Sequence, residues 1–118
     1  MADRTTQRVL SPADVKELAD AQFIDVRTPE EFHAGHIPGA RFIQLDEVQA
    51  AADGLDRARP VVFYCRSGDR SALAVDAFRA SGWDAYAIEG GLLAWAGDGL
   101  LLEPDSGEVA HHSGLPPA

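Results

Sequence analysis

The chain has 118 residues, 46 % of them hydrophobic, and its 10 basic and 19 acidic side chains give a formal net charge of −9. This length suits one domain whose core is large enough to fold without a disulfide or a structural metal. The acidic balance excludes nucleic acid as a partner, because binding the phosphate backbone requires a surface rich in Lys and Arg.

Short apolar runs alternate along the chain with segments of helical periodicity, which is typical of an α/β protein with a parallel sheet. The pairs Ser11-Pro12 and Thr28-Pro29 are N-cap signals that start two helices. We predict strands at residues 7–10, 22–26, 41–43, 60–64 and 84–88. The first helix starts at Pro12 and has Val15, Leu18 and Ala19 on its buried face. Further helices are predicted from Thr28 through Phe32, from Leu45 to about Ala52, over residues 69–81 and around Leu93 to Ala96.

The composition changes after about residue 103 to Pro, Gly, Ser and acidic residues with no apolar periodicity. We therefore expect one domain over residues 1–103 and a flexible C-terminal tail over residues 104–118. We also expect that this tail can be removed with little loss of activity or melting temperature.

The segment CRSGDRS follows the most apolar predicted strand and precedes the longest predicted helix. Cys65 therefore lies at the carboxyl end of a buried strand, the edge where open α/β sheets bind ligands. Gly68 lets the loop turn tightly, so that backbone N–H groups can surround the Cys65 sulfur. Because a helix N-terminus contributes only about 0.3 to 1 kcal/mol, most of the stabilisation of a thiolate has to come from loop N–H groups and from Arg66 or Arg70. The pattern predicts a reactive nucleophile rather than an inert core cysteine.

Three motifs in this order, FIDVRTPEEFHAGHIPGA, CRSGDRS and EGGLLAW, resemble the rhodanese (thiosulfate sulfurtransferase) homology domain over roughly residues 7–102. The resemblance implies an α/β fold with a five-stranded parallel sheet flanked by helices on both faces. It also implies that Cys65 accepts a sulfane sulfur as a persulfide and passes it to a nucleophile. It implies no cofactor and no metal.

The spacing from Cys65 to Arg70 is C-x4-R, which resembles the sulfurtransferases of this fold. Its phosphatases resemble C-x5-R, which would need an arginine where this chain has Ser71. A loop that is one residue shorter makes a cradle sized for one added sulfur atom and not for a phosphoryl group. The predicted site consists of the catalytic Cys65 and the substrate-binding loop residues Arg66, Ser67, Gly68, Asp69, Arg70 and Ser71.

Three further residues are predicted to support this loop: Asp25, Arg27 and Glu31. Asp25 and Arg27 come at the carboxyl end of the second predicted strand, and we interpret them as part of a structural ion-pair network with Glu30 or Glu31. Arg70 lies in the first turn of a helix, where a cation opposes the macrodipole, and therefore needs Glu30 or Glu31 as its partner.

Two histidines, His33 and His36, are spaced as metal ligands can be, but no cysteine or paired acid completes a site. We therefore predict no metal there.

The lone cysteine excludes an intramolecular disulfide and is typical of a reducing compartment. The first residues, MADRTTQRVL, hold no apolar signal-peptide core, and no stretch approaches the roughly 20 apolar residues of a membrane span. Nine Arg against one Lys, with twenty Ala, is typical of a GC-rich genome. We expect a cytoplasmic bacterial protein, a monomer or weak dimer, with no membrane contact.

The function that follows is a sulfurtransferase that moves a sulfane sulfur from thiosulfate or a persulfide donor to a thiol, protein or cyanide-like acceptor through a Cys65 persulfide. The alternative is a non-catalytic or carrier module that docks a partner protein. Asp69 reduces the net charge of the loop to +1, which weakens its attraction for the thiosulfate dianion. A protein or small-thiol persulfide is therefore an equally suitable donor.

Overall fold

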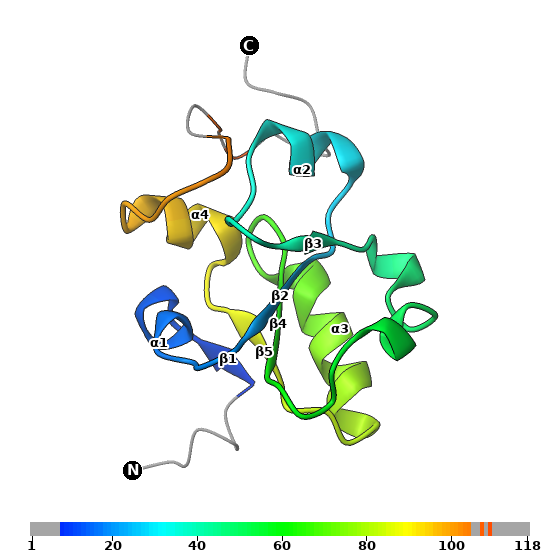
Figure 1. Cartoon of the computed structure of the whole chain (residues 1–118). Coiled ribbons are helices and arrows are strands. Elements are labelled where there is room, and N and C mark those ends of the chain that lie inside the picture. Colours follow the sequence, from blue (N-terminus) through cyan, green and yellow to red (C-terminus); the bar gives the residue numbers. More distant parts are fainter. Residues whose placement is uncertain (1–7, 105–106, 108, 110–118) are drawn as a thin grey trace.

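A computed structural model of the chain describes residues 8–104, 107 and 109 (Figure 1). Five strands form one sheet in the order β1-β5-β4-β2-β3, with every neighbouring pair parallel, which confirms the predicted α/β architecture. The strands are β1 (Val9–Leu10), β2 (Gln22–Asp25), β3 (Arg41–Phe42), β4 (Val61–Tyr64) and β5 (Ala85–Ile88). The α-helices are α1 (Pro12–Lys16), α2 (Pro29–Ala34), α3 (Asp69–Ala80) and α4 (Gly91–Gly97).

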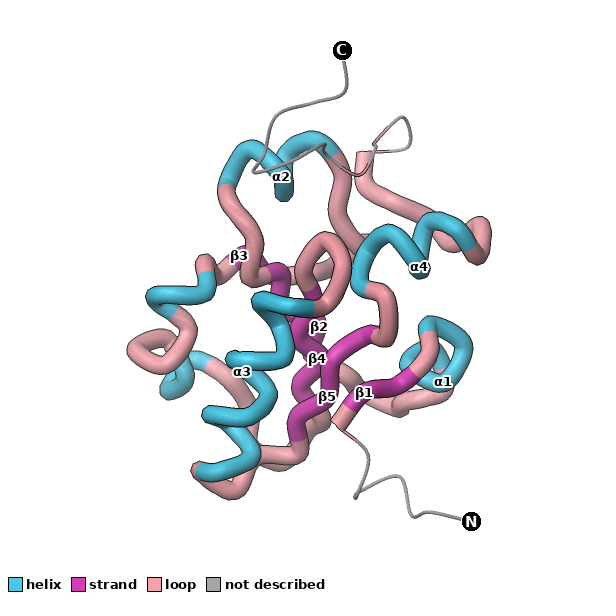
Figure 2. Tube along the Cα trace, turned by 180° about the vertical axis from the view of Figure 1, so that it is seen from behind, coloured by secondary structure: helices cyan, strands magenta, loops and turns pink. Residues whose placement is uncertain are grey.

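Helices cover both faces of the sheet, as expected (Figures 1 and 2). Successive side chains of the central strand β4 point to opposite faces, and all of them are buried beneath these helices. On one face Phe63 packs edge-on against Phe78 of α3, with ring centroids 4.8 Å apart. On the other face Val62 lies in a second cluster with Val15 of α1 and Leu92 of α4. All four residues of β4 are fully buried, so the loop that follows it begins at the centre of the molecule.

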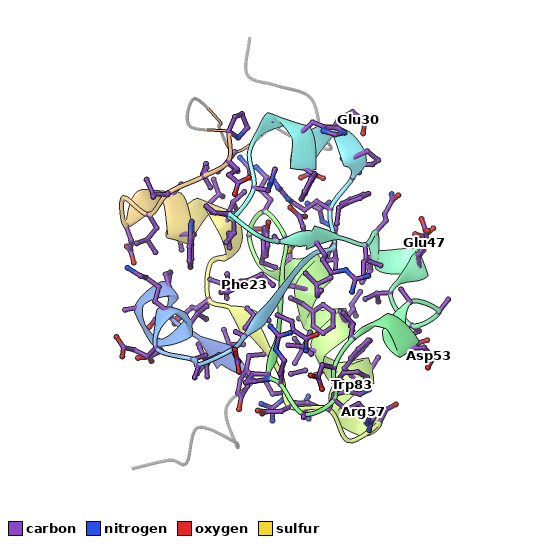
Figure 3. The ribbon with its side chains drawn as sticks, in the orientation of Figure 1. Phe23, Glu30, Glu47, Asp53, Arg57 and Trp83 are labelled. Atoms are coloured by element: carbon purple, nitrogen blue, oxygen red, sulfur yellow. The ribbon has the colours of Figure 1, made fainter. Side chains whose placement is uncertain are left out.

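Trp83 and Trp95 are both largely buried. Trp83 lies against Phe78 and beneath the guanidinium of Arg57, which is 4.6 Å from the ring centroid (Figure 3). Trp95 meets the edge of Phe23 on the other face of the sheet. The two rings therefore close the two apolar clusters rather than marking a binding surface.

The predicted helix from Leu45 to about Ala52 is wrong. The structure has two short 3-10 helices there, η2 (Leu45–Glu47) and η3 (Ala52–Gly54), separated by a turn. Neither Gln44 nor Ala51, the residues before them, makes a side-chain cap. A short helix without caps is marginal, so the tighter 3-10 turns form instead.

Most of the predicted C-terminal tail, residues 104–118, lies outside the described residues. Before it, His36 and Glu103 exchange backbone hydrogen bonds of 3.0 and 2.7 Å, which attach the end of the domain to the segment after α2. Within it, Val109 is half-buried against the cluster of Leu92 and Trp95. Among the described residues, no helix has the length and apolar character needed to cross a membrane.

Tail deletion should therefore give two different results. Deleting residues 110–118, whose sequence has no apolar periodicity, should leave the melting temperature unchanged. Deleting residues 104–118 should lower it by about 2 to 4 °C, because the half-buried Val109 contributes less than about 1 kcal/mol. Thermal melts of both truncated chains, with sulfur-transfer rates, check this. A fall of more than about 5 °C for the shorter deletion would contradict it.

Candidate active site

The Cys65 sulfur is buried inside a ring of loop hydrogen bonds. The N–H of Gly68 donates to Sγ at 3.1 Å and that of Ser71 at 3.4 Å. The thiol lies 3.6 Å from Ser71 Oγ, which accepts its proton while the Ser71 O–H donates to the Gly68 carbonyl at 3.1 Å. These N–H groups favour a negative charge on the sulfur, which is the state that acts as a nucleophile.

Local sequence accounts for this ring. Gly68 has φ +122°, a conformation that side chains other than glycine rarely adopt, and it stands where the loop turns into α3. Its turn aims two N–H groups at the sulfur. The other predicted loop residues lie outside the ring: Ser67 and Asp69 are exposed, and Arg66 is half-exposed.

The loop is held from behind by the first turn of α4. The N–H of Leu92 donates to the Cys65 carbonyl at 2.8 Å, and that of Leu93 donates to the Arg66 carbonyl at 3.0 Å. A Cβ on Gly91, which has φ +62°, would lie 2.6 Å from the Arg66 carbonyl oxygen. Because Gly91 has no side chain, the backbone at the start of α4 can contact the backbone of Cys65 and Arg66. From the sequence we predict only a helix around Leu93 to Ala96 here and miss this contact. The glycine pair one residue after a buried strand is the signal that could have revealed it.

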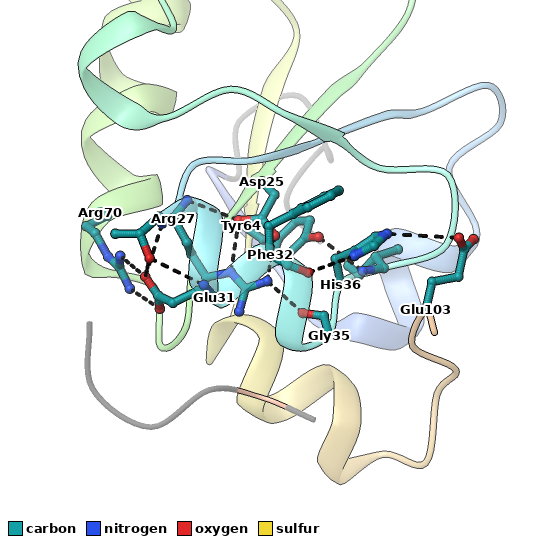
Figure 4. Close-up of polar contacts among 11 residues, drawn as sticks. Asp25, Arg27, Glu31, Phe32, Gly35, His36, Tyr64, Arg70 and Glu103 are labelled. Atoms are coloured by element: carbon teal, nitrogen blue, oxygen red, sulfur yellow. Dashed lines mark hydrogen bonds and ion pairs between the residues drawn. The ribbon is translucent and has the colours of Figure 1, made fainter. Parts of the chain in front are cut away.

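Arg70 does not contact the sulfur and is held by Glu31, one of the two acids that the sequence offered as its partner. Its Nη1 and Nη2 donate to Oε1 and Oε2 at 2.8 and 3.0 Å (Figure 4). Glu31 is fully buried and also accepts from the N–H of Thr28 at 3.1 Å, which closes a capping box at the start of α2. The ion pair therefore ties α2 to the active-site loop.

Burial alone would raise the pKa of Glu31, but the hydrogen bonds from Arg70 and from the Thr28 N–H outweigh it and lower the pKa below its usual 4.5. Glu31 therefore stabilises the fold at neutral pH, and this contribution is lost as the pH falls below about 4.5.

We expect Glu31→Gln to lower the melting temperature at pH 7, and we expect this deficit to shrink as the pH falls below 4.5 toward the lowered pKa of Glu31, because protonation removes the same charge. Thermal melts from pH 7 to pH 3 measure this. Glu30→Gln, on an exposed neighbour in α2 (Figure 3), is the matched control and should follow the wild type throughout. A Glu31→Gln deficit that persists unchanged at pH 3 would contradict the role of the charge.

Asp25 and Arg27 pair with each other rather than with Glu30 or Glu31. Arg27 Nε and Nη2 donate to the two Asp25 carboxylate oxygens at 2.9 and 2.6 Å, and Nη2 also donates to the Gly35 carbonyl at 2.8 Å (Figure 4). Both side chains are fully buried. The pair therefore fastens the end of α2 to the sheet beside the loop, and none of the contacts described for it reaches the sulfur.

His33 and His36, which are spaced as metal ligands can be, lie in different environments. His36 stacks on Phe32, with ring centroids 3.8 Å apart, and its Nδ1 lies 2.9 Å from the Phe32 carbonyl oxygen. His33 is exposed near the end of α2. In the part of the chain that the structure describes, no three His, Cys, Asp or Glu side chains gather as metal ligands would.

The family profile described as "Rhodanese-like domain" matches residues 11–98. The chain therefore belongs to the rhodanese-like domain family.

Two relatives are named sulfurtransferases. The chain is 36 % identical over 93 residues to the putative sulfurtransferase YtwF of Bacillus subtilis, covering 75 % of this chain and 90 % of that protein. It is 35 % identical over 94 residues to the thiosulfate sulfurtransferase GlpE of Pseudomonas aeruginosa, covering 77 % of this chain and 84 % of that protein. It is also 40 % identical over 78 residues to YqhL of Bacillus subtilis, an uncharacterized protein of which it spans 62 %.

Among solved structures, a rhodanese-related protein of Thermoplasma volcanium matches with a TM-score of 0.75 and 29 % identity. The match covers 80 % of this chain and 96 % of that one. The fold and the sequence thus lead to the same family.

Proposed function

We propose that this protein is a sulfurtransferase that carries a sulfane sulfur on Cys65. The observation that supports this most directly is the ring of N–H groups around the sulfur, with donors at 3.1 and 3.4 Å. Such a ring stabilises the anionic sulfur of the thiolate, which is the nucleophile in the first step of the transfer.

The reaction has two steps. In the first, the Cys65 thiolate attacks the sulfane sulfur of the donor, the S–S bond of the donor breaks, and the remainder leaves as sulfite or as a thiolate. In the second, an acceptor thiolate or cyanide attacks the outer sulfur of the persulfide, and the bond to Sγ breaks. Cys65 returns as a thiolate, so no oxidant, reductant or cofactor is consumed.

The size of the loop favours sulfur over phosphoryl transfer. The ring closes on the sulfur through Gly68 and Ser71, and Arg70 is bound to Glu31 by two hydrogen bonds. A phosphatase needs its loop arginine to bind the phosphoryl oxygens. Here the arginine holds the neighbouring helix instead.

Intact-protein mass after incubation with thiosulfate, or with the persulfide of a small thiol, tests the proposal. We expect the mass to increase by one sulfur atom and to return to its original value when cyanide or a thiol is added. An unchanged mass with both donors would overturn the proposal and favour a module that only docks a partner. If Cys65 takes up a sulfur atom but passes it to no acceptor, the proposal that this site catalyses repeated transfer is also wrong.

The two loop arginines should have different roles. Arg66→Ala removes a positive charge beside the nucleophile and should raise the KM for thiosulfate about threefold, with little change in melting temperature. Arg70→Ala leaves the buried Glu31 carboxylate unpaired and should lower the melting temperature by about 8 °C, which corresponds to about 2 kcal/mol after allowance for the partial exposure of Arg70. Steady-state kinetics and thermal melts of both variants check this. If the two variants have the same KM and the same melting temperature, the two arginines do not have different roles.

A further inference from the structure

The side-chain charges of the Cys65 loop itself cancel once its ion pair with α2 is included. Within the loop, Arg66 and Arg70 are positive and Asp69 is negative. The structure adds Glu31, whose carboxylate is bound to Arg70 at 2.8 and 3.0 Å. The loop and its ion pair with α2 thus hold two positive and two negative side chains, and the thiolate adds a further negative charge to them.

Asp69 is the exposed acid of this group. Glu31 is fully buried and engaged by Arg70, whereas Asp69 is exposed at the first position of α3. Its neighbour Gly68 donates its N–H to the Cys65 sulfur at 3.1 Å. Because consecutive Cα atoms are about 3.8 Å apart, the Asp69 carboxylate lies within about 10 Å of the sulfur, which is one Debye length at 0.1 M salt.

Taking the sulfur transfer proposed above as its basis, we infer that Asp69 selects the donor: it disfavours dianionic thiosulfate and leaves thiol persulfides as the donor class. The repulsion from one carboxylate is proportional to the charge of the donor. It is therefore twice as large, in free energy, for a dianion as for a monoanion. It vanishes for a neutral hydropersulfide.

The transfer balances with a hydropersulfide donor, R–S–SH. The Cys65 thiolate attacks the outer sulfur, which keeps its proton, and the S–S bond of the donor breaks. The bonding electrons leave with the inner sulfur as the thiolate RS⁻. With thiosulfate the leaving group is the sulfite dianion, so donor and product both carry two negative charges close to Asp69.

Alkylation of Cys65 tests the charge effect without any sulfur transfer. Rate constants for iodoacetamide, which is neutral, and iodoacetate, which is an anion, are measured at low salt. We expect Asp69→Asn to raise the rate with iodoacetate, relative to iodoacetamide, about twofold. The ratio cancels any change in the thiolate fraction or in access to the sulfur, so a merely structural role of Asp69 at the start of α3 would not move it.

Asp53→Asn is the matched control, because it changes the net charge equally but lies on η3 at the periphery of the molecule (Figure 3). Its ratio should equal that of the wild type. Equal ratios in the wild type, Asp69→Asn and Asp53→Asn would overturn the inference.

Donor kinetics provide the second test. Asp69→Asn should raise kcat/KM about fourfold for thiosulfate and at most about twofold for the persulfide of 2-mercaptoethanol, since the effect on a dianion is the square of that on a monoanion. Equal gains for the two donors would overturn the assignment of Asp69 as the selecting residue. If neither donor loads sulfur on any variant, the proposed sulfur transfer is wrong, and the alkylation ratio still decides whether Asp69 repels anions.

Discussion

Cys65→Ser should abolish sulfur transfer while leaving the fold intact. Cys65 is the only cysteine of the chain, so no second thiol can take over the sulfur. A serine hydroxyl does not ionise at neutral pH and forms no persulfide. The loop is held by its backbone, through Leu92 N–H to the Cys65 carbonyl and Leu93 N–H to the Arg66 carbonyl, and these contacts do not involve the sulfur.

The readouts for Cys65→Ser are the intact mass after exposure to donor, the steady-state rate and the melting temperature. We expect no added sulfur, no rate above the uncatalysed reaction, and a melting temperature within a few degrees of the wild type. A well-folded Cys65→Ser protein that still transfers sulfur would show that the persulfide forms elsewhere, and the mechanism would be wrong.

Gly91→Ala should disrupt the active-site loop although residue 91 lies outside it. A Cβ there would come within 2.6 to 2.7 Å of the Arg66 and Cys65 carbonyl oxygens, and φ of +62° is unfavourable for alanine. Strain of this kind typically costs about 1 to 3 kcal/mol, which corresponds to a fall in melting temperature of about 10 °C. The loop must move away from α4, so we also expect the transfer rate to fall more than about tenfold.

Gly97→Ala is the matched control for this substitution. Gly97 ends the same helix, and apart from its chain neighbours and the backbone of its own helix no described atom lies within 4 Å of the position of its Cβ. Its replacement should leave both the rate and the melting temperature close to the wild type. Similar losses in Gly91→Ala and Gly97→Ala would mean that α4 responds to any added methyl group and that the contact with the loop carries no special weight.

The proposed mechanism depends on α2 and α4 as well as on the loop itself. Glu31 of α2 binds Arg70 of the loop (Figure 4). Gly91 lets the first turn of α4 approach the Cys65 and Arg66 carbonyls, which accept from the N–H groups of Leu92 and Leu93. Each support comes from a segment distant in sequence from Cys65. The three motifs of the chain thus form one assembly around a single sulfur.

The sequence alone determined the five parallel strands and the position of Cys65 at the end of the central one. Strand β4 is a continuous apolar run, and such a run is recognisable because burial on both faces leaves no place for polar residues. The tight turn at Gly68 could also be predicted from the sequence, because a turn of this kind depends on a glycine and its immediate neighbours in the chain.

Only the tertiary structure decided which charges meet and which backbones touch. The sequence left Glu30 and Glu31 open as partners of Arg70. The spacing from Thr28 suits Glu31 for a capping box, but only the packing of α2 beside the loop places Glu31 opposite Arg70, 39 residues away. Likewise, the role of Gly91 depends on a helix packing against a loop from an earlier strand. Contacts between distant segments depend on how whole elements pack, and local patterns do not record that packing.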